Sequence, residues 1–167
     1  MPLARQPYRP SKRPVRGFAM SATGLEVFDK TIHETNAFMK IVMRELGTDD
    51  RRIAFGALRG ALHALRDQLD AHAAAHLAAQ LPMLLRGLFY EGWKPDGVSA
   101  HARHVDDFLA RMSGFLPPRL QGYPEESARA AFAALCECVD GGEMAKIVRQ
   151  MPRDLRMLWP EDIGAAA

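Results

Sequence analysis

The chain has 167 residues, 48% of them hydrophobic, which is enough for one ordinary domain with a sizeable core. Its 22 basic and 20 acidic residues nearly balance, and its two cysteines are too few for a disulfide scaffold. The sequence has no apolar run of 18 residues and no signal-peptide pattern, so we expect no membrane span and a cytoplasmic location.

Residues 1–19 differ in composition from the rest of the chain. They carry five basic residues and no acid, which leaves 17 basic against 20 acidic residues in the remainder. Four of the eleven prolines also fall here and prevent a regular helix, so we expect a disordered basic arm. The arm is either a tail without function, the more ordinary case at a terminus, or a segment that binds nucleic acid or an acidic membrane surface. We expect no nucleic-acid binding elsewhere in the chain.

The first predicted helix runs from about residue 24 to 46. Thr23 and Glu26 have the spacing of a capping box, and Gly47 is a typical helix end. The apolar residues between them recur at helical spacing, which places them on one inward face. They are Leu25, Phe28, Ile32, Met39, Val42, Met43 and Leu46.

Two more helices complete the first half of the chain, residues 24–93. Thr48 is the predicted cap of the second helix, which has an almost uninterrupted apolar stripe from Ala54 to Leu65. Asp70 is the predicted cap of the third, whose stripe continues in phase through Pro82. Because a proline removes a backbone hydrogen bond, we expect this helix to kink or break there.

The second half, residues 98–160, has the same organisation. After a linker at residues 92–97, Ser99 is the predicted cap of a fourth helix, and Pro124 is well placed to open a fifth. Asp140 is the predicted cap of a sixth helix, with a second kink or break at Pro152. Residues 161–167 are predicted to be a tail. Since period-two alternation is absent, the fold class is all-α, with six main helices and no strand.

An internal duplication relates the two halves. At a fixed offset of seventy residues, positions 54–88 match positions 124–158 without gaps, and we expect two tandem three-helix repeats with equivalent proline breaks. The identical pairs are Arg59/Arg129, Ala61/Ala131, Ala64/Ala134, Leu65/Leu135, Asp70/Asp140, Ala75/Ala145, Gln80/Gln150, Pro82/Pro152, Leu85/Leu155, Arg86/Arg156 and Leu88/Leu158.

Three segments resemble a known prokaryotic family. They are residues 77–93 (LAAQLPMLLRGLFYEGW), residues 151–156 (MPRDLR) and residues 20–25 (MSATGL). Together they are similar to the family catalogued as domain of unknown function 2267 (DUF2267), over about residues 20–160. The resemblance implies a small all-helical cytosolic protein, and it brings no activity or cofactor with it. The basic arm lies outside the family pattern.

The candidate binding residues are aromatic and basic side chains near the ends of the third and sixth helices. They are Arg86, Arg156, Tyr90, Trp93 and Trp159. The aromatic residues either close the core or anchor a partner, because Tyr, Trp and Arg are common at interfaces. The arginines either bind helix-end carbonyl groups or face a ligand. We expect the corner from Tyr90 to Trp93 to be partly exposed and to take part in association.

No constellation in the sequence predicts catalysis or a cofactor. Two histidine pairs share a helix face, His72/His76 and His101/His104, but two ligands do not make a metal site. The lone Cys136/Cys138 pair lacks the further thiolates that zinc needs and is typical of small core residues. The paired carboxylates fall near helix starts, where the helix dipole explains them.

Two hypotheses of function follow. The preferred one is a non-catalytic helical module for protein interaction or self-association, with a second copy or another protein as partner. The alternative is a protein that binds a small ligand or metal, or a weakly marked enzyme, in the crevice where the two halves meet, using Arg86 and Arg156.

Overall fold

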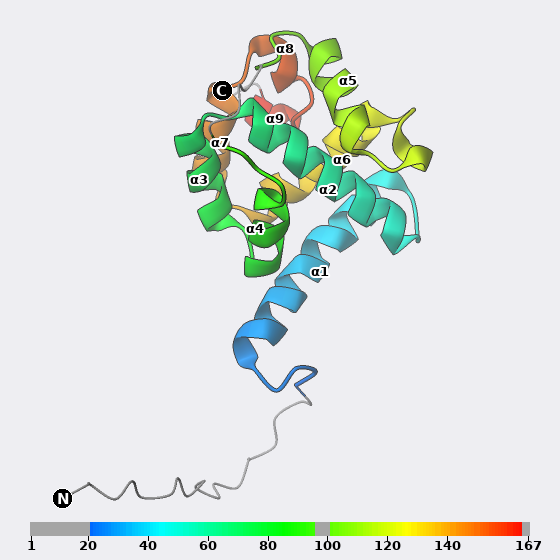
Figure 1. The fold of residues 1–167 in the computed structure, drawn as a ribbon, viewed down its shortest axis with the longest axis vertical. Helices are drawn as coiled ribbons and strands as arrows, with labels where there is room; N and C mark the ends of the chain where they lie inside the picture. The colour runs from blue at the N-terminus through cyan, green and yellow to red at the C-terminus, as the bar shows by residue number, and fades with distance from the viewer. Residues whose placement is uncertain (1–20, 96–100, 165–167) are drawn as a thin grey trace, which may run out of the picture.

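The computed structural model describes residues 21–95 and 101–164, and these residues form helices and turns without any strand (Figure 1). The elements in chain order are α1 (Glu26–Leu46), α2 (Arg51–Gln68), α3 (Ala71–Gln80), α4 (Met83–Tyr90), α5 (Val105–Phe115), the 3-10 turn η1 (Pro118–Leu120), α6 (Pro124–Cys138), α7 (Gly141–Arg149), α8 (Arg153–Arg156) and α9 (Glu161–Gly164). The predicted all-α class is confirmed. None of the helices described is long and apolar enough to span a bilayer.

The described ranges contain nine α-helices, whereas the sequence predicted six. Two prolines, Pro82 and Pro152, account for most of the difference, because each divides one predicted helix into two. Pro82 separates α3 from α4 and Pro152 separates α7 from α8, with backbone angles of φ −51°, ψ 147° and φ −52°, ψ 147°. The ninth helix, α9, lies in the predicted tail. At Pro82 and Pro152 the extended ψ ends one helix, and the next helix begins directly after the proline. The missing N–H of the proline costs no hydrogen bond there, because the N–H groups at a helix start have no partner within the helix.

Several predicted helix starts are corrected. Leu25 is the N-cap of α1, and the Thr23–Glu26 capping box is not formed. Instead the Asp29 carboxylate accepts hydrogen bonds from the backbone N–H and the hydroxyl of Thr23. Asp50, rather than Thr48, accepts the capping bond of α2, because its carboxylate faces the N–H of Arg52.

The predicted start of the fourth helix is also wrong. The helix α5 begins only at Val105, after His104, and Asp106 and Asp107 occupy its first turn. Ser99 lies outside the described residues. The predicted caps Asp70 and Asp140 are confirmed, since each carboxylate accepts a hydrogen bond from the N–H three residues later. The two caps, seventy residues apart, therefore make the same capping hydrogen bond.

The core is built by helices that pack across the two halves of the sequence. The helix α1 packs most extensively against α6, and α5 packs against α2, while α2 and α6 contact each other at the centre. Small residues allow close approach at these contacts. A Cβ atom added to Gly60 of α2 would come within 2.7 Å of the Cδ2 atom of Leu116, so the Leu116 side chain at the end of α5 would have to shift. Each half therefore covers part of the other's core.

One end of α1 extends beyond this core (Figure 1). Its C-terminal part buries Met39 and Val42, as the stripe predicts, and also Phe38, which the stripe does not include. Its N-terminal part does not, and the predicted inward positions Leu25, Phe28 and Ile32 are exposed. The reason is length: α1 has 21 residues and α6 has 15, which is about 31 Å against about 22 Å at the rise of an α-helix. The extra turns of α1 extend past α6, where the first turn of α4 contacts them at Thr31.

Candidate functional site

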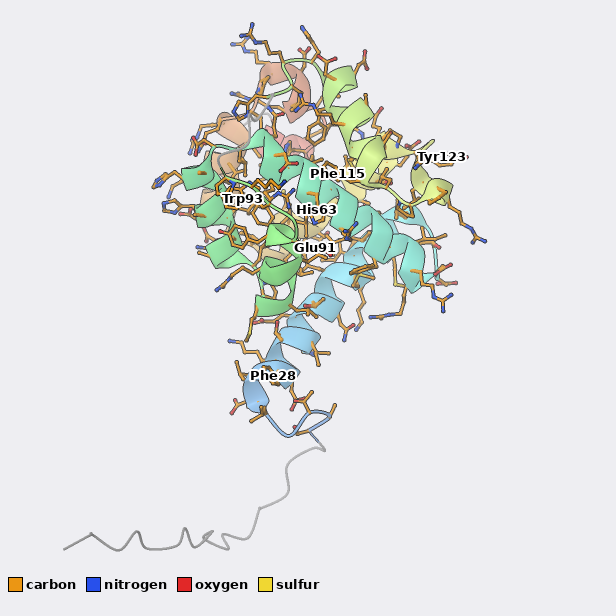
Figure 2. The ribbon with its side chains drawn as sticks, in the orientation of Figure 1. Phe28, His63, Glu91, Trp93, Phe115 and Tyr123 are labelled. Atoms are coloured by element: carbon orange, nitrogen blue, oxygen red, sulfur yellow. The ribbon has the colours of Figure 1, made fainter. Side chains whose placement is uncertain are left out.

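Exposed apolar side chains gather at the projecting end of α1, and we call this group the overhang surface. It consists of Leu25, Val27, Phe28 and Ile32 from the start of α1, with Met83 and Leu84 from the first turn of α4; all are between 41% and 53% exposed. The two helices are joined here, because the Thr31 hydroxyl accepts a hydrogen bond from the N–H of Leu84 at 3.0 Å. Phe28 marks the projecting end in Figure 2.

A shallow groove lies beside the overhang surface. It has a volume of about 360 Å³ and is formed by α1, the break between α3 and α4, and the end of α6. Its lining residues include Glu34, Phe38, Pro82 and the exposed Cys138. Burial raises the pKa of the neighbouring Cys136 thiol to about 12 and raises that of Cys138 as well. Both thiols are therefore protonated at neutral pH and are poor nucleophiles.

A polar face of α2 holds the end of α4 (Figure 2). His63 and Arg66 are 3% and 4% exposed, yet both are paired. His63 Nε2 lies 2.9 Å from the carbonyl oxygen of Leu88, and Arg66 donates to the carbonyls of Phe89 and Glu91 at 2.9 and 2.8 Å. These carbonyls end a helix, where the dipole favours positive charge. The cluster is therefore a capping device for α4.

The Glu91 carboxylate lies on the solvent side of the same cluster. It accepts a hydrogen bond from Arg59 Nε at 2.8 Å and lies 3.6 Å from His63 Nε2. The hydrogen bond with Arg59 lowers the pKa of Glu91, and burial is the main cause that lowers the pKa of His63. A neutral imidazole that donates to a carbonyl fits this site, so the group is satisfied without a ligand.

Arg86 and Arg156 both bind the ends of the preceding helices. Arg86 donates to the carbonyls of Ala78, Ala79 and Leu81 at 2.8 to 3.1 Å. Arg156 donates to the carbonyls of Arg149 and Met151 at 2.9 and 3.1 Å. Each guanidinium bridges the break that its proline creates. The structure thus places both side chains on helix-end carbonyls, one of the two roles that the sequence left open.

The predicted aromatic residues lie in two different environments. Trp159 is 3% exposed and stacks on Phe132 with ring centroids 4.1 Å apart, so it is part of the core. Tyr90 and Trp93 are half-buried and stack on each other at 5.2 Å. Their rings also pack against the core cluster. A role of this corner in association stays a prediction.

Two further hollows contain charged groups. One, between α6, α8 and α9, is lined by Arg129, Arg153 and Arg156, with Trp159 and Glu161. The other lies where the end of α2 meets residues 101–103 and the α7–α8 break. In the second hollow, His101 Nδ1 contacts the carbonyl oxygen of Gln68 at 2.8 Å. The lining of the first hollow includes three arginines, whereas that of the second includes one, Arg103.

The histidines contact helix-end or side-chain groups and do not converge on a common point. The rings of His72 and His76 contact each other edge to face at 4.5 Å. His104 Nδ1 lies 2.9 Å from the Asp154 carboxylate, and this contact raises the pKa of His104. Among the described residues, no group of three or more His, Cys, Asp or Glu side chains is arranged to hold a metal ion.

With this geometry in view, the family can be assigned. Residues 35–158 match the model of the family described as an uncharacterized conserved protein, DUF2267, which is well over half of the chain. The chain belongs to this family. The resemblance seen in the sequence is thereby confirmed. No curated protein is similar enough to this DUF2267 chain to count as a match. The matched region begins at Thr35, so the α1 residues of the overhang surface precede it.

The sequence analysis missed the overhang surface in this DUF2267 protein. It assigned Leu25, Phe28 and Ile32 to the inward face, because periodicity shows which residues share a face and not where the supporting helix ends. One signal was available: the first predicted helix is clearly longer than the fifth. No sequence signal indicated which helix α1 packs against.

Proposed function

We propose that this protein is a non-catalytic interaction module that self-associates through the overhang surface. One observation carries the proposal: six apolar side chains, each about half exposed, lie at the projecting end of α1 and the adjoining first turn of α4, and three of them, Leu25, Phe28 and Ile32, continue the apolar stripe of α1 beyond the end of the core. Contiguous exposed apolar surface of this kind marks sites of association in soluble proteins. The satisfied hydrogen bonds of His63, Arg66 and Arg86 support a structural role for those polar groups.

A second copy of the chain is the occupant that the shape of this surface favours. The end of α1 projects away from the rest of the molecule, so two such ends can lie side by side around a two-fold axis while the two bodies stay apart (Figure 1). Six half-exposed side chains leave on the order of 500 Å² of apolar surface, which is less than the roughly 800 Å² per partner of a standard interface. We therefore expect a dimer of modest, micromolar stability.

We also propose that the two halves are structural repeats of one ancestral unit. Support comes from the caps Asp70 and Asp140, the equal backbone angles at Pro82 and Pro152, and the reciprocal packing of α1 on α6 and of α5 on α2. The overhang then distinguishes the halves: α1 has 21 residues, whereas α5, which occupies the corresponding place, has 11.

The chain offers a matched pair of variants that tests self-association. Phe28 in the overhang surface is 44% exposed and Phe55 on α2 is 46% exposed, so replacing either by Ser removes the same side chain from a similar environment. We expect the wild type to be a dimer at tens of micromolar by light scattering. Phe28→Ser is expected to weaken dimerisation at least tenfold, because an interface anchor is worth roughly 2 kcal/mol or more, and Phe55→Ser to leave it unchanged.

Two results would contradict the proposal. A wild type that stays monomeric at several hundred micromolar excludes a functional homodimer of this kind. Equal weakening by Phe28→Ser and Phe55→Ser places the contact elsewhere or makes it non-specific. A Phe28→Ser protein whose helical circular dichroism is largely lost would show that the variant acts on folding, and Ile32→Lys then gives an independent test of the same surface.

A further inference from the structure

We propose that the hollow between α6, α8 and α9 binds a small phosphate-like oxyanion. Its lining includes three arginines, Arg129, Arg153 and Arg156, and one acid, Glu161. The open volume is about 780 Å³, larger than that of the groove beside α1. Three guanidinium groups around one hollow supply planar, fixed N–H donors, the geometry that phosphate and carboxylate groups prefer.

Two of the three guanidinium groups are held in place by the fold. Arg129 is fixed by the Glu125 carboxylate and by the carbonyl oxygen of Met157 at 2.7 Å. Arg156 is fixed through Nε and Nη2 by helix-end carbonyls, which leaves its Nη1 without a partner among the described residues. Side chains that are already ordered lose little conformational entropy when a ligand binds.

The third arginine has no structural task in the described part of the chain. Arg153 is exposed, and it forms neither a hydrogen bond nor an ion pair with any described residue. Glu161, the single acid in the lining, likewise forms no ion pair with a described residue. The hollow therefore keeps an excess of positive charge, although the molecule as a whole carries a formal charge of only +2.

The first half of the chain supplies an internal comparison. At the positions seventy residues earlier stand Arg59, Met83 and Arg86, so one of the three arginines is replaced by methionine. There Arg59 donates to Glu91, the residue that corresponds to Glu161, and its charge is neutralised. The capping arginine is common to both halves. Arg129 is likewise paired, with Glu125, so the difference is the additional cation Arg153, which occurs only in the second half; binding is the function that this difference fits.

The test uses inorganic phosphate as the probe and the full-length protein. The Nε–H signals of the arginine side chains are followed by NMR during a phosphate titration at constant ionic strength, with chloride as the balancing ion. We expect saturable shifts of the Arg153 and Arg156 signals in the millimolar range or tighter. Arg153→Met introduces the residue of the first half and is expected to weaken binding about tenfold, as for the loss of a charge-assisted hydrogen-bond donor.

Arg119 on η1 provides the matched control, because it is also an exposed arginine and lies outside the hollow. Arg119→Met is expected to change the affinity for phosphate less than twofold. Equal weakening of phosphate binding by the two variants would show that binding responds only to the overall positive charge, and it would overturn the proposal. So would the absence of saturation below roughly 10 mM phosphate. Arg153 has no partner in the described fold, so Arg153→Met should melt like the wild type and report on binding alone.

A second experiment distinguishes a free phosphate compound from a lipid headgroup as the ligand. Vesicles of phosphatidylglycerol are sedimented with the protein in the presence and absence of phosphate. We expect no co-sedimentation, which assigns the site to a free phosphate compound. Vesicle binding that both phosphate and Arg153→Met abolish would assign the same phosphate chemistry to a lipid. Vesicle binding that Arg153→Met leaves intact, without saturable binding of phosphate, would overturn the site. Neither the phosphate titration nor the vesicle experiment depends on the overhang surface.

Discussion

Polar residues in this protein are used to end helices. The buried His63 and Arg66 bind three carbonyl groups at the end of α4, Arg86 binds three at the end of α3, and Arg156 binds two at the end of α7. A buried cation is costly unless several acceptors surround it, and the last turn of a helix supplies such acceptors together with a favourable dipole. The breaks at the two prolines create the ends of α3 and α7.

The pH dependence of stability follows from His63. Burial lowers its pKa in the folded protein below the ordinary value near 6.5, and the nearby positive charges of Arg66 and Arg59 act in the same direction against Glu91. Below pH 6.5 the His63 side chain binds a proton in the unfolded chain, whereas in the folded chain it stays neutral until a lower pH. We therefore expect the free energy of unfolding to fall with decreasing pH, by up to about 1.4 kcal/mol per pH unit, and to be free of this contribution above pH 6.5.

His63→Gln should flatten this decrease, since glutamine does not titrate. Urea denaturation of the wild type and the variant between pH 5 and 8 measures it. His104 has the opposite dependence, because its contact with Asp154 raises its pKa and favours the folded state at low pH. His104 is present in both the wild type and the His63→Gln variant, so the difference between their stability curves isolates the contribution of His63. A constant offset between the two curves over the whole range would contradict the prediction.

Single arginines stabilise the breaks in the helices. The α3–α4 and α7–α8 pairs each turn at a proline, and the arginine four residues after that proline binds the carbonyls that the break leaves without a partner. Unsatisfied carbonyl groups at a partly buried helix end are unfavourable, so these bonds should contribute measurably to folding.

Replacing either arginine by methionine tests this contribution. Arg86→Met and Arg156→Met keep most of the apolar stem and are each expected to lower the free energy of unfolding by about 1 to 2 kcal/mol, because charge-assisted hydrogen bonds to carbonyls are lost. Arg119→Met should stay within about 0.5 kcal/mol of the wild type, as for an exposed side chain without such bonds. Chemical denaturation measures all three. Equal, small effects would show that water replaces the guanidinium groups without cost.

At the scale of the molecule, the two halves of the chain depend on each other. The helix α1 covers α6 and α5 covers α2, so a fragment that contains only one half exposes the apolar face that the other half buries. Phe132 of α6 is 1% exposed and lies in a cluster with Phe108 of α5 and Trp159. We expect one cooperative unit.

Separate fragments test this dependence. Residues 20–97 and 98–164, produced as two polypeptides, are expected to have low helicity and no cooperative melting when alone, because each lacks a cover for its core. Mixing them should restore part of the helical signal, while the intact chain should unfold in one transition. Calorimetry and circular dichroism provide the readouts. A fragment that melts cooperatively by itself would show that its half is an independent domain.

The sequence by itself determined the all-helical class, the family, the breaks at Pro82 and Pro152 and the caps Asp70 and Asp140. These features depend on residues close together in the chain: apolar spacing, a missing N–H, or a carboxylate within three residues of its donor. Only the tertiary structure decided that α1 lies on α6, that Leu25, Phe28 and Ile32 project beyond it, and that Arg129, Arg153 and Arg156 line one hollow. Such features depend on which helices meet and where the shorter one ends. A periodic pattern carries no information on either point, because the same apolar stripe is compatible with a buried and an uncovered position.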